Sequence, residues 1–99
     1  MRLTEQQIRV IKHTAHEVLG DGAQVTLFGS RVDDSAKGGD IDLLFASPAT
    51  IENQAFTIGQ IYAKLARQLG EQKIDVLLKA PNLQSQPIHQ VAEQSGIQL

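Results

Sequence analysis

The sequence predicts a single small domain that contains both helices and strands. Its 99 residues suffice for one compact core and are too few for two, so we expect one domain over residues 1–99. Apolar residues recur at helical spacing over residues 4–19 and 50–69. Short apolar runs typical of strands lie at residues 25–28, 40–45 and 73–78.

Composition narrows the classes of function. A net charge of -2, only three Phe and one Tyr, and no cluster of Lys and Arg disfavour an extended nucleic-acid surface. The absence of cysteine excludes disulfides, zinc thiolate sites and thiol nucleophiles, and is compatible with a reducing cytoplasm. No signal peptide or membrane-spanning run is apparent, so we expect a cytoplasmic protein without membrane association.

The first helix is predicted over residues 4–19. Thr4 and Gln7 have the spacing of a capping box, and Gly20 ends the helix. An apolar stripe follows at helical spacing: Ile8, Ile11, Ala15, Val18 and Leu19. His13 and His16 lie off this stripe with no third ligand nearby in sequence, which favours surface positions over a metal pair.

The candidate catalytic and binding residues lie mainly in the segment 25–45, whose sequence is VTLFGSRVDDSAKGGDIDLLF. In the strand 40–45, alternation places Asp40 and Asp42 on one face, with their Cβ atoms ~6.6 Å apart. Paired carboxylates in an apolar strand repel each other, and a divalent cation removes that cost. Oxygen ligands of this kind suit Mg²⁺, or Mn²⁺, together with the phosphates of a nucleotide.

A turn at Gly29-Ser30 lies before this strand. Glycine allows close approach of the backbone to a ligand, and the N–H groups of the turn with the Ser30 hydroxyl form an anion-binding concavity. Arg31 either contacts a phosphate or is solvated or salt-bridged, and the sequence leaves both open. The rest of the 31–39 connection is expected to be a flexible loop, with Lys37 a less favoured phosphate contact.

The second helix is predicted over residues 50–69. Tyr62 is expected to pack with its apolar stripe, and Gly59 is expected to make a close contact. A third strand is predicted over residues 73–78. The stripe comprises Ile51, Ala55, Ile58, Tyr62, Leu65 and Leu69. Asp75 is anomalous in an apolar strand. It either faces water from an edge strand or supplies a third carboxylate beside Asp40 and Asp42.

A short helix is expected over residues 87–94. Ile88, Val91 and Ala92 are predicted to point inward, and His89 is predicted to lie at the surface.

Gly29-Ser30, nine further residues, and Asp40-Ile41-Asp42-Leu43 together resemble the signature of the DNA polymerase β-like nucleotidyltransferases. The short length and the Leu-Phe-Gly-Ser-Arg lead-in are most similar to the minimal nucleotidyltransferases of prokaryotes. The resemblance covers about residues 25–78. It implies an α+β fold with a small mixed sheet, three aspartates on one face, and helices packed on the opposite face. The 31–39 connection lacks the Arg-Gly and the Pro that the commoner family version carries there.

The resemblance also implies a mechanism. Two Mg²⁺ would be held by Asp40 and Asp42, with Asp75 as third metal ligand and possible proton acceptor, while Gly29, Ser30 and Arg31 would bind the nucleotide. A nucleoside monophosphate, in the first instance AMP from ATP, would pass to an acceptor hydroxyl. Minimal nucleotidyltransferases commonly pair with a helical HEPN protein as antitoxin to toxin, so the implied acceptor is such a partner.

Two other functions remain open from the sequence. The chain could be an antitoxin that acts by protein contact alone, without catalysis. It could also be a small-molecule nucleotidyltransferase, which is disfavoured because nothing in 99 residues could enclose an acceptor.

Overall fold

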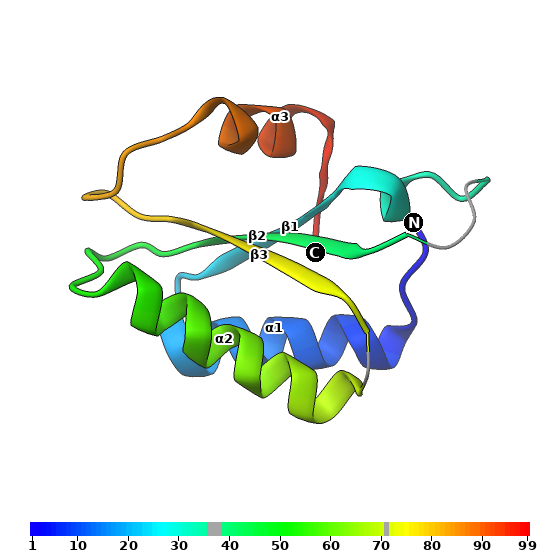
Figure 1. Cartoon of the computed structure of the whole chain (residues 1–99), viewed down its shortest axis with the longest axis horizontal. Coiled ribbons are helices and arrows are strands. Elements are labelled where there is room, and N and C mark those ends of the chain that lie inside the picture. Colours follow the sequence, from blue (N-terminus) through cyan, green and yellow to red (C-terminus); the bar gives the residue numbers. More distant parts are fainter. Residues whose placement is uncertain (36–38, 71) are drawn as a thin grey trace.

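The chain folds into a four-stranded mixed sheet with helices on both of its faces (Figure 1). The computed structural model describes residues 1–35, 39–70 and 72–99. The elements follow the order α1 (Glu5–Leu19), β1 (Gln24–Phe28), η1 (Gly29–Val32), β2 (Ile41–Ala46), α2 (Gln54–Leu69), β3 (Ile74–Lys79), α3 (Pro87–Ser95) and β4 (Ile97–Gln98). None of the helices in these described residues is both long and apolar enough to cross a membrane.

The strand order is β3-β2-β1-β4. β1 is antiparallel to β2 and to β4, whereas β2 and β3 are parallel, so the prediction of a small mixed sheet is confirmed. The parallel pair is joined through α2, as a parallel connection requires a crossover. β3 is therefore an edge strand, and its residue Asp75 is exposed.

The main core lies between the sheet and the pair α1 and α2, which cover the same face (Figure 1). Its fully buried side chains come from alternate strand positions and from one side of each helix. They include Ile11, Leu27, Ile41, Leu43, Phe45, Ile61 and Leu65. The two-residue period of the strands therefore turns Asp42 and Asp75 to the other face.

α3 lies across that other face, which corrects the expectation that the helices pack on one face only (Figure 1). Ala92 of α3 contacts Phe28 and Leu44 in a second, smaller apolar cluster. The predicted inward position of Ala92 is confirmed, but those of Ile88 and Val91 are wrong because both are exposed, and His89, predicted at the surface, is buried.

His89 is buried because its ring satisfies backbone groups. The Gln86 N–H donates to Nδ1 (3.0 Å), which leaves Nε2 to donate to the Leu78 carbonyl (3.2 Å). The imidazole therefore connects the start of α3 to the edge strand through two backbone groups.

Capping residues define where α1 and α2 begin, and a long-range contact shifts the start of α2. The Thr4–Gln7 capping box at α1 is confirmed, with both reciprocal hydrogen bonds present. α2 begins later than predicted, because Asn53 caps it and the Asn82 side chain bonds both the N–H and the carbonyl of Ile51. These long-range bonds keep residues 50–52 out of the helix.

Candidate functional site

The parallel pairing of β2 and β3 brings two of the predicted carboxylates together. Asp42 and Asp75 are partners in the ladder, so their side chains leave the same face of adjacent strands, ~4.8 Å apart along the sheet. The protonated Asp42 carboxyl can donate a hydrogen bond to Asp75. The sequence left two alternatives for Asp75, a water-facing residue on an edge strand or a carboxylate beside the other aspartates. Both describe its position, since it is exposed on an edge strand and lies beside Asp42.

Asp42 is the aspartate of this site whose pKa is clearly raised above its usual value. Partial burial, followed by the hydrogen bond and charge of Asp75 and the charge of Asp40, raises the pKa of Asp42 from 3.8 to about 6. The Lys73 ammonium opposes this shift. A cation bound beside Asp42 would offset the repulsion from the neighbouring carboxylates that opposes its ionisation.

Asp40 lies directly before β2, half-buried, and its Oδ2 atom is 3.6 Å from the Lys73 Nζ atom. The Ile41 N–H donates to the Lys73 carbonyl (3.0 Å), which fixes the two chain segments side by side. Lys73 was not predicted as part of the site. A signal was available in the parallel patterns Lys73-Ile74-Asp75 and Asp40-Ile41-Asp42, but it required the strand register.

Gly29 lies directly against the Asp42 carboxylate. It adopts φ +77°, and a Cβ atom at this position would collide with Oδ2 of Asp42. The predicted tight turn is the start of the 3-10 helix η1, in which Gly29 and Ser30 are both exposed. Glycine is therefore required here both by the left-handed backbone and by the space that Asp42 occupies.

The Ser30 hydroxyl lies beside Gly39, where φ is +89° and a Cβ atom would collide with Oγ. The two ends of the 31–39 connection thus meet at Ser30. Lys37, a possible phosphate contact, lies outside the described residues.

Arg31 is half-buried and bonded to backbone. Its Nε donates to the Gly39 carbonyl (3.3 Å) and its NH1 to the Arg2 carbonyl (3.0 Å). In this arrangement Arg31 connects the 31–39 segment to the N-terminal segment through two backbone carbonyls, neither of which forms a salt bridge, and the phosphate contact stays a prediction.

Arg2 is a further cation at the site that the sequence did not indicate. Its NH2 donates to the Ser30 carbonyl and its Nε to the Asp33 carbonyl, both at 3.0 Å. The guanidinium therefore lies at the turn that was expected to bind phosphate. Nothing local in the sequence could reveal it, because 28 residues separate Arg2 from Ser30.

The residues present suit a hard divalent cation in the chemistry of their donors, which are carboxylate oxygens held beside a serine turn. Asp42 and Asp75 form a pair, and Asp40 stands beside Lys73. Over residues 1–35, 39–70 and 72–99, no three His, Asp or Glu side chains are grouped as a ready-made metal centre. His13 and His16 pair with Glu17 and Asp21 on the surface of α1.

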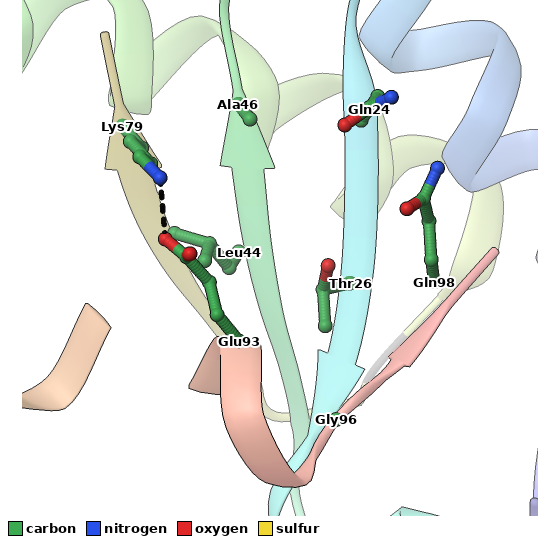
Figure 2. Close-up of a pocket in the computed structure, with 8 residues that line it drawn as sticks. All are labelled: Gln24, Thr26, Leu44, Ala46, Lys79, Glu93, Gly96 and Gln98. Atoms are coloured by element: carbon green, nitrogen blue, oxygen red, sulfur yellow. Dashed lines mark hydrogen bonds and ion pairs between the residues drawn. The ribbon is translucent and has the colours of Figure 1, made fainter. Parts of the chain in front are cut away.

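A hollow of about 300 Å³ lies on the same face of the sheet, at the opposite ends of β2 and β3 (Figure 2). Leu44 and Ala46 form part of its floor, and the ion pair between Lys79 and Glu93 (2.6 Å) spans one side. Neither Asp42 nor Asp75 lines this hollow, and the lining residue of β2 nearest to the carboxylates, Leu44, is two residues or ~6.6 Å along the strand from Asp42. The hollow is therefore separate from the aspartate site.

Comparisons of the chain with protein-family models, with curated proteins and with solved structures found no match. The resemblance to minimal nucleotidyltransferases stays a prediction, which rests on the residues themselves.

Proposed function

We propose that this protein is a Mg²⁺-dependent nucleotidyltransferase of the DNA polymerase β-like type. The observation that carries the proposal is the pairing of Asp42 with Asp75 on one face of adjacent strands, directly against the Gly29-Ser30 turn. Carboxylates on a sheet next to a serine turn provide the two parts that nucleotide chemistry needs, a cation site and a phosphate cradle.

In this proposal Asp40, Asp42 and Asp75 hold divalent cations, Mg²⁺ or Mn²⁺. Cations bound there would neutralise the phosphates and lower the pKa of the attacking hydroxyl. Gly29 and Ser30 hold phosphate oxygens of the nucleoside triphosphate through backbone N–H groups and the Ser30 hydroxyl. The guanidinium of Arg2, with Arg31, provides positive charge at the same turn.

The reaction is an in-line displacement at the α-phosphorus. The acceptor hydroxyl oxygen forms a bond to that phosphorus, the bond to the bridging oxygen breaks, and pyrophosphate leaves. The hydroxyl proton passes to the Asp75 carboxylate, which is exposed and lies beside Asp42.

We further propose AMP from ATP as the transferred group and a HEPN-type helical protein as the acceptor, with this chain as the antitoxin of the pair. The aspartate face supports an acceptor of protein size, because Asp75 lies on an exposed edge strand and is not enclosed in a pocket. A small-molecule acceptor would be expected to occupy an enclosing cavity.

The test is transfer of label from ATP to the protein that co-purifies with the chain. ATP labelled at the α-phosphate should label that protein in the presence of Mg²⁺, whereas ATP labelled at the γ-phosphate should not. Asp42→Asn should abolish the labelling and Asp21→Asn, a change of the same chemistry at an exposed position on the loop after α1, should preserve it. Undiminished labelling by Asp42→Asn would refute the site. Binding of the partner without any label transfer would favour the contact-only antitoxin.

A further inference from the structure

The hollow on the α3 face of the sheet arises because a short side chain lies between two long ones in one row of the sheet (Figure 2). The ladders place Lys79 of β3 beside Ala46 of β2, and Ala46 beside Gln24 of β1. Ladder partners project from the same face, so Lys79 and Gln24 stand on either side of Ala46, with their Cα atoms roughly 9.6 Å apart. The hollow of about 300 Å³ lies over this gap and has the size of a small-molecule pocket.

One side of the hollow, formed by β1 and β4, carries hydrogen-bonding groups that the chain itself leaves unused. Gln24 and Thr26 lie on β1, and Gln98 is the ladder partner of Thr26 on β4. In the part of the chain that the structure describes, the Thr26 hydroxyl and the two side-chain amides form no hydrogen bond. Figure 2 shows these three side chains together on one side of the hollow. Two amides and a hydroxyl provide both donors and acceptors, which suits an uncharged polar group.

The other side of the hollow carries one charge of each sign. The Lys79 Nζ atom lies 2.6 Å from a carboxylate oxygen of Glu93, and both side chains are about half exposed. The pair has no net charge. A ligand with a single charge would leave either Lys79 or Glu93 without a partner, whereas a ligand with both charges keeps both of them paired.

Gly96 holds these two sides in position. It ends α3, and a Cβ atom added to it would collide with the Ala92 carbonyl and with the Cγ2 atom of Thr26. The end of α3, which carries Glu93, therefore lies directly against β1. This contact fixes the position of the charged side of the hollow relative to the amide side.

We propose that the hollow binds a free amino acid with an uncharged polar side chain, of the asparagine or glutamine type. Its α-carboxylate pairs with Lys79 and its α-ammonium with Glu93, so one ion pair is replaced by two without a change in net charge. Both groups are attached to one carbon atom, which lets them meet the two side chains together. The aliphatic part of the ligand lies on Leu44 and Ala46, and its terminal amide reaches the hydrogen-bonding groups of β1 and β4.

The open, polar character of the hollow sets the expected affinity. Half-exposed ion pairs each contribute little, so we expect a dissociation constant of about 1 mM. Because neither Asp42 nor Asp75 lines the hollow, the proposal does not depend on the function of these aspartates.

The first experiment is an NMR titration of the ¹⁵N-labelled full chain with L-glutamine up to about 20 mM, which exceeds the expected dissociation constant. The side-chain amide signals of Gln24 and Gln98 and the backbone amide signals of Thr26 and Gly96 should shift and saturate. Three analogues each lack one group: glutaramic acid the ammonium, 4-aminobutanamide the carboxylate and L-norleucine the amide. Each should bind at least about fivefold more weakly than glutamine. Absence of a saturable shift, or equal binding of any of the three analogues, would overturn the proposal.

Substitutions locate the charged end of the ligand. Lys79→Met and Glu93→Gln should each weaken glutamine binding at least about fivefold. Lys64→Met is the matched control, because it removes the ion pair between Lys64 of α2 and Glu17 of α1, which is of comparable exposure and lies on the other face of the sheet. Lys64→Met should bind glutamine as the wild type does. Unchanged binding by Lys79→Met, or an equal loss in Lys64→Met, would overturn the assignment.

Discussion

Asp42→Asn should stabilise the metal-free protein at neutral pH. The substitution keeps the size of the side chain, and the amide can still donate a hydrogen bond to Asp75, but it removes the carboxylate whose ionisation the fold opposes. The same change should abolish nucleotide transfer. The site would then be maintained at a cost to stability, as functional sites often are.

The magnitude follows from the pKa of Asp42. A rise from 3.8 to about 6 corresponds to about 3 kcal/mol without screening. Because the side chain keeps contact with solvent, screening reduces this to about 1 kcal/mol. For a domain of this size, 1 kcal/mol corresponds to an increase of the melting temperature by about 4–8 °C.

The direction of the Asp42 pKa shift determines how the free energy of unfolding depends on pH. The folded state binds the Asp42 proton more tightly than the unfolded state does, so its favourable contribution is complete below pH 3.8 and is lost as the pH rises through about 6. The difference in unfolding free energy between Asp42→Asn and wild type should therefore grow from acid to neutral pH and then level off.

Denaturant unfolding in the presence of a chelator, between about pH 4 and about pH 8, measures this difference. Asp21→Asn serves as the control, because Asp21 is exposed and its difference from wild type should stay small across the range. A difference that does not change with pH, or an Asp42→Asn chain that is less stable than wild type at pH 7, would refute the reasoning.

Three further changes should have defined effects. Mg²⁺ should raise the melting temperature of the wild-type protein and leave that of Asp42→Asn unchanged in differential scanning fluorimetry, and an equal rise in both would place the cation elsewhere. Gly29→Ala should destabilise the fold by about 1–2 kcal/mol because of its left-handed backbone, with a further loss from collision with Asp42, measured by denaturant unfolding. His89→Ala should cost about 2–3 kcal/mol, because it leaves the buried Leu78 carbonyl without its donor, and a loss below about 1 kcal/mol would mean that water replaces the ring.

The sequence alone predicted those structural features that depend on local or periodic interactions. The Thr4–Gln7 capping box lies within one helical turn, and it is present as predicted. The parallel pairing of β2 with β3 places Asp75 beside Asp42, whereas Asp40 lies directly before β2, so the strand alternation predicted for Asp40 and Asp42 does not extend to Asp40. Their roles in metal binding and catalysis stay predictions.

Periodicity placed most of the α2 stripe correctly, since Ile58, Leu65 and Leu69 pack in the main core, but it failed at Ala55 and Tyr62, which are exposed. The predicted stripe included Tyr62, which is exposed, while Ile61 one position away is fully buried. Tyr62 fits the helical spacing of the stripe but lies at its edge, so the spacing alone did not show that it faces solvent. Gly59 was expected to make a close contact, but it is exposed and a Cβ atom added there would meet nothing within 4 Å.

The remaining errors come from contacts between distant residues. Arg2 reaches Ser30 only after α1 has folded onto the sheet, and Asn82 delays the start of α2 from 31 residues away. His89 was assigned to the surface from its polarity, but two backbone groups compensate the burial of its ring nitrogens.

Because Asp42 and Asp75 are partners in the parallel ladder, the strand register that forms the core also fixes their relative position. Ile74 and Leu78 anchor β3 to the interior, and a slip of one residue would turn them outward and drive Asp75 inward. Such a slip would remove Ile74 and Leu78 from the core and bury the Asp75 carboxylate in their place. A chain that has formed its core therefore already holds Asp42 and Asp75 side by side, and no loop closure is needed to bring them together.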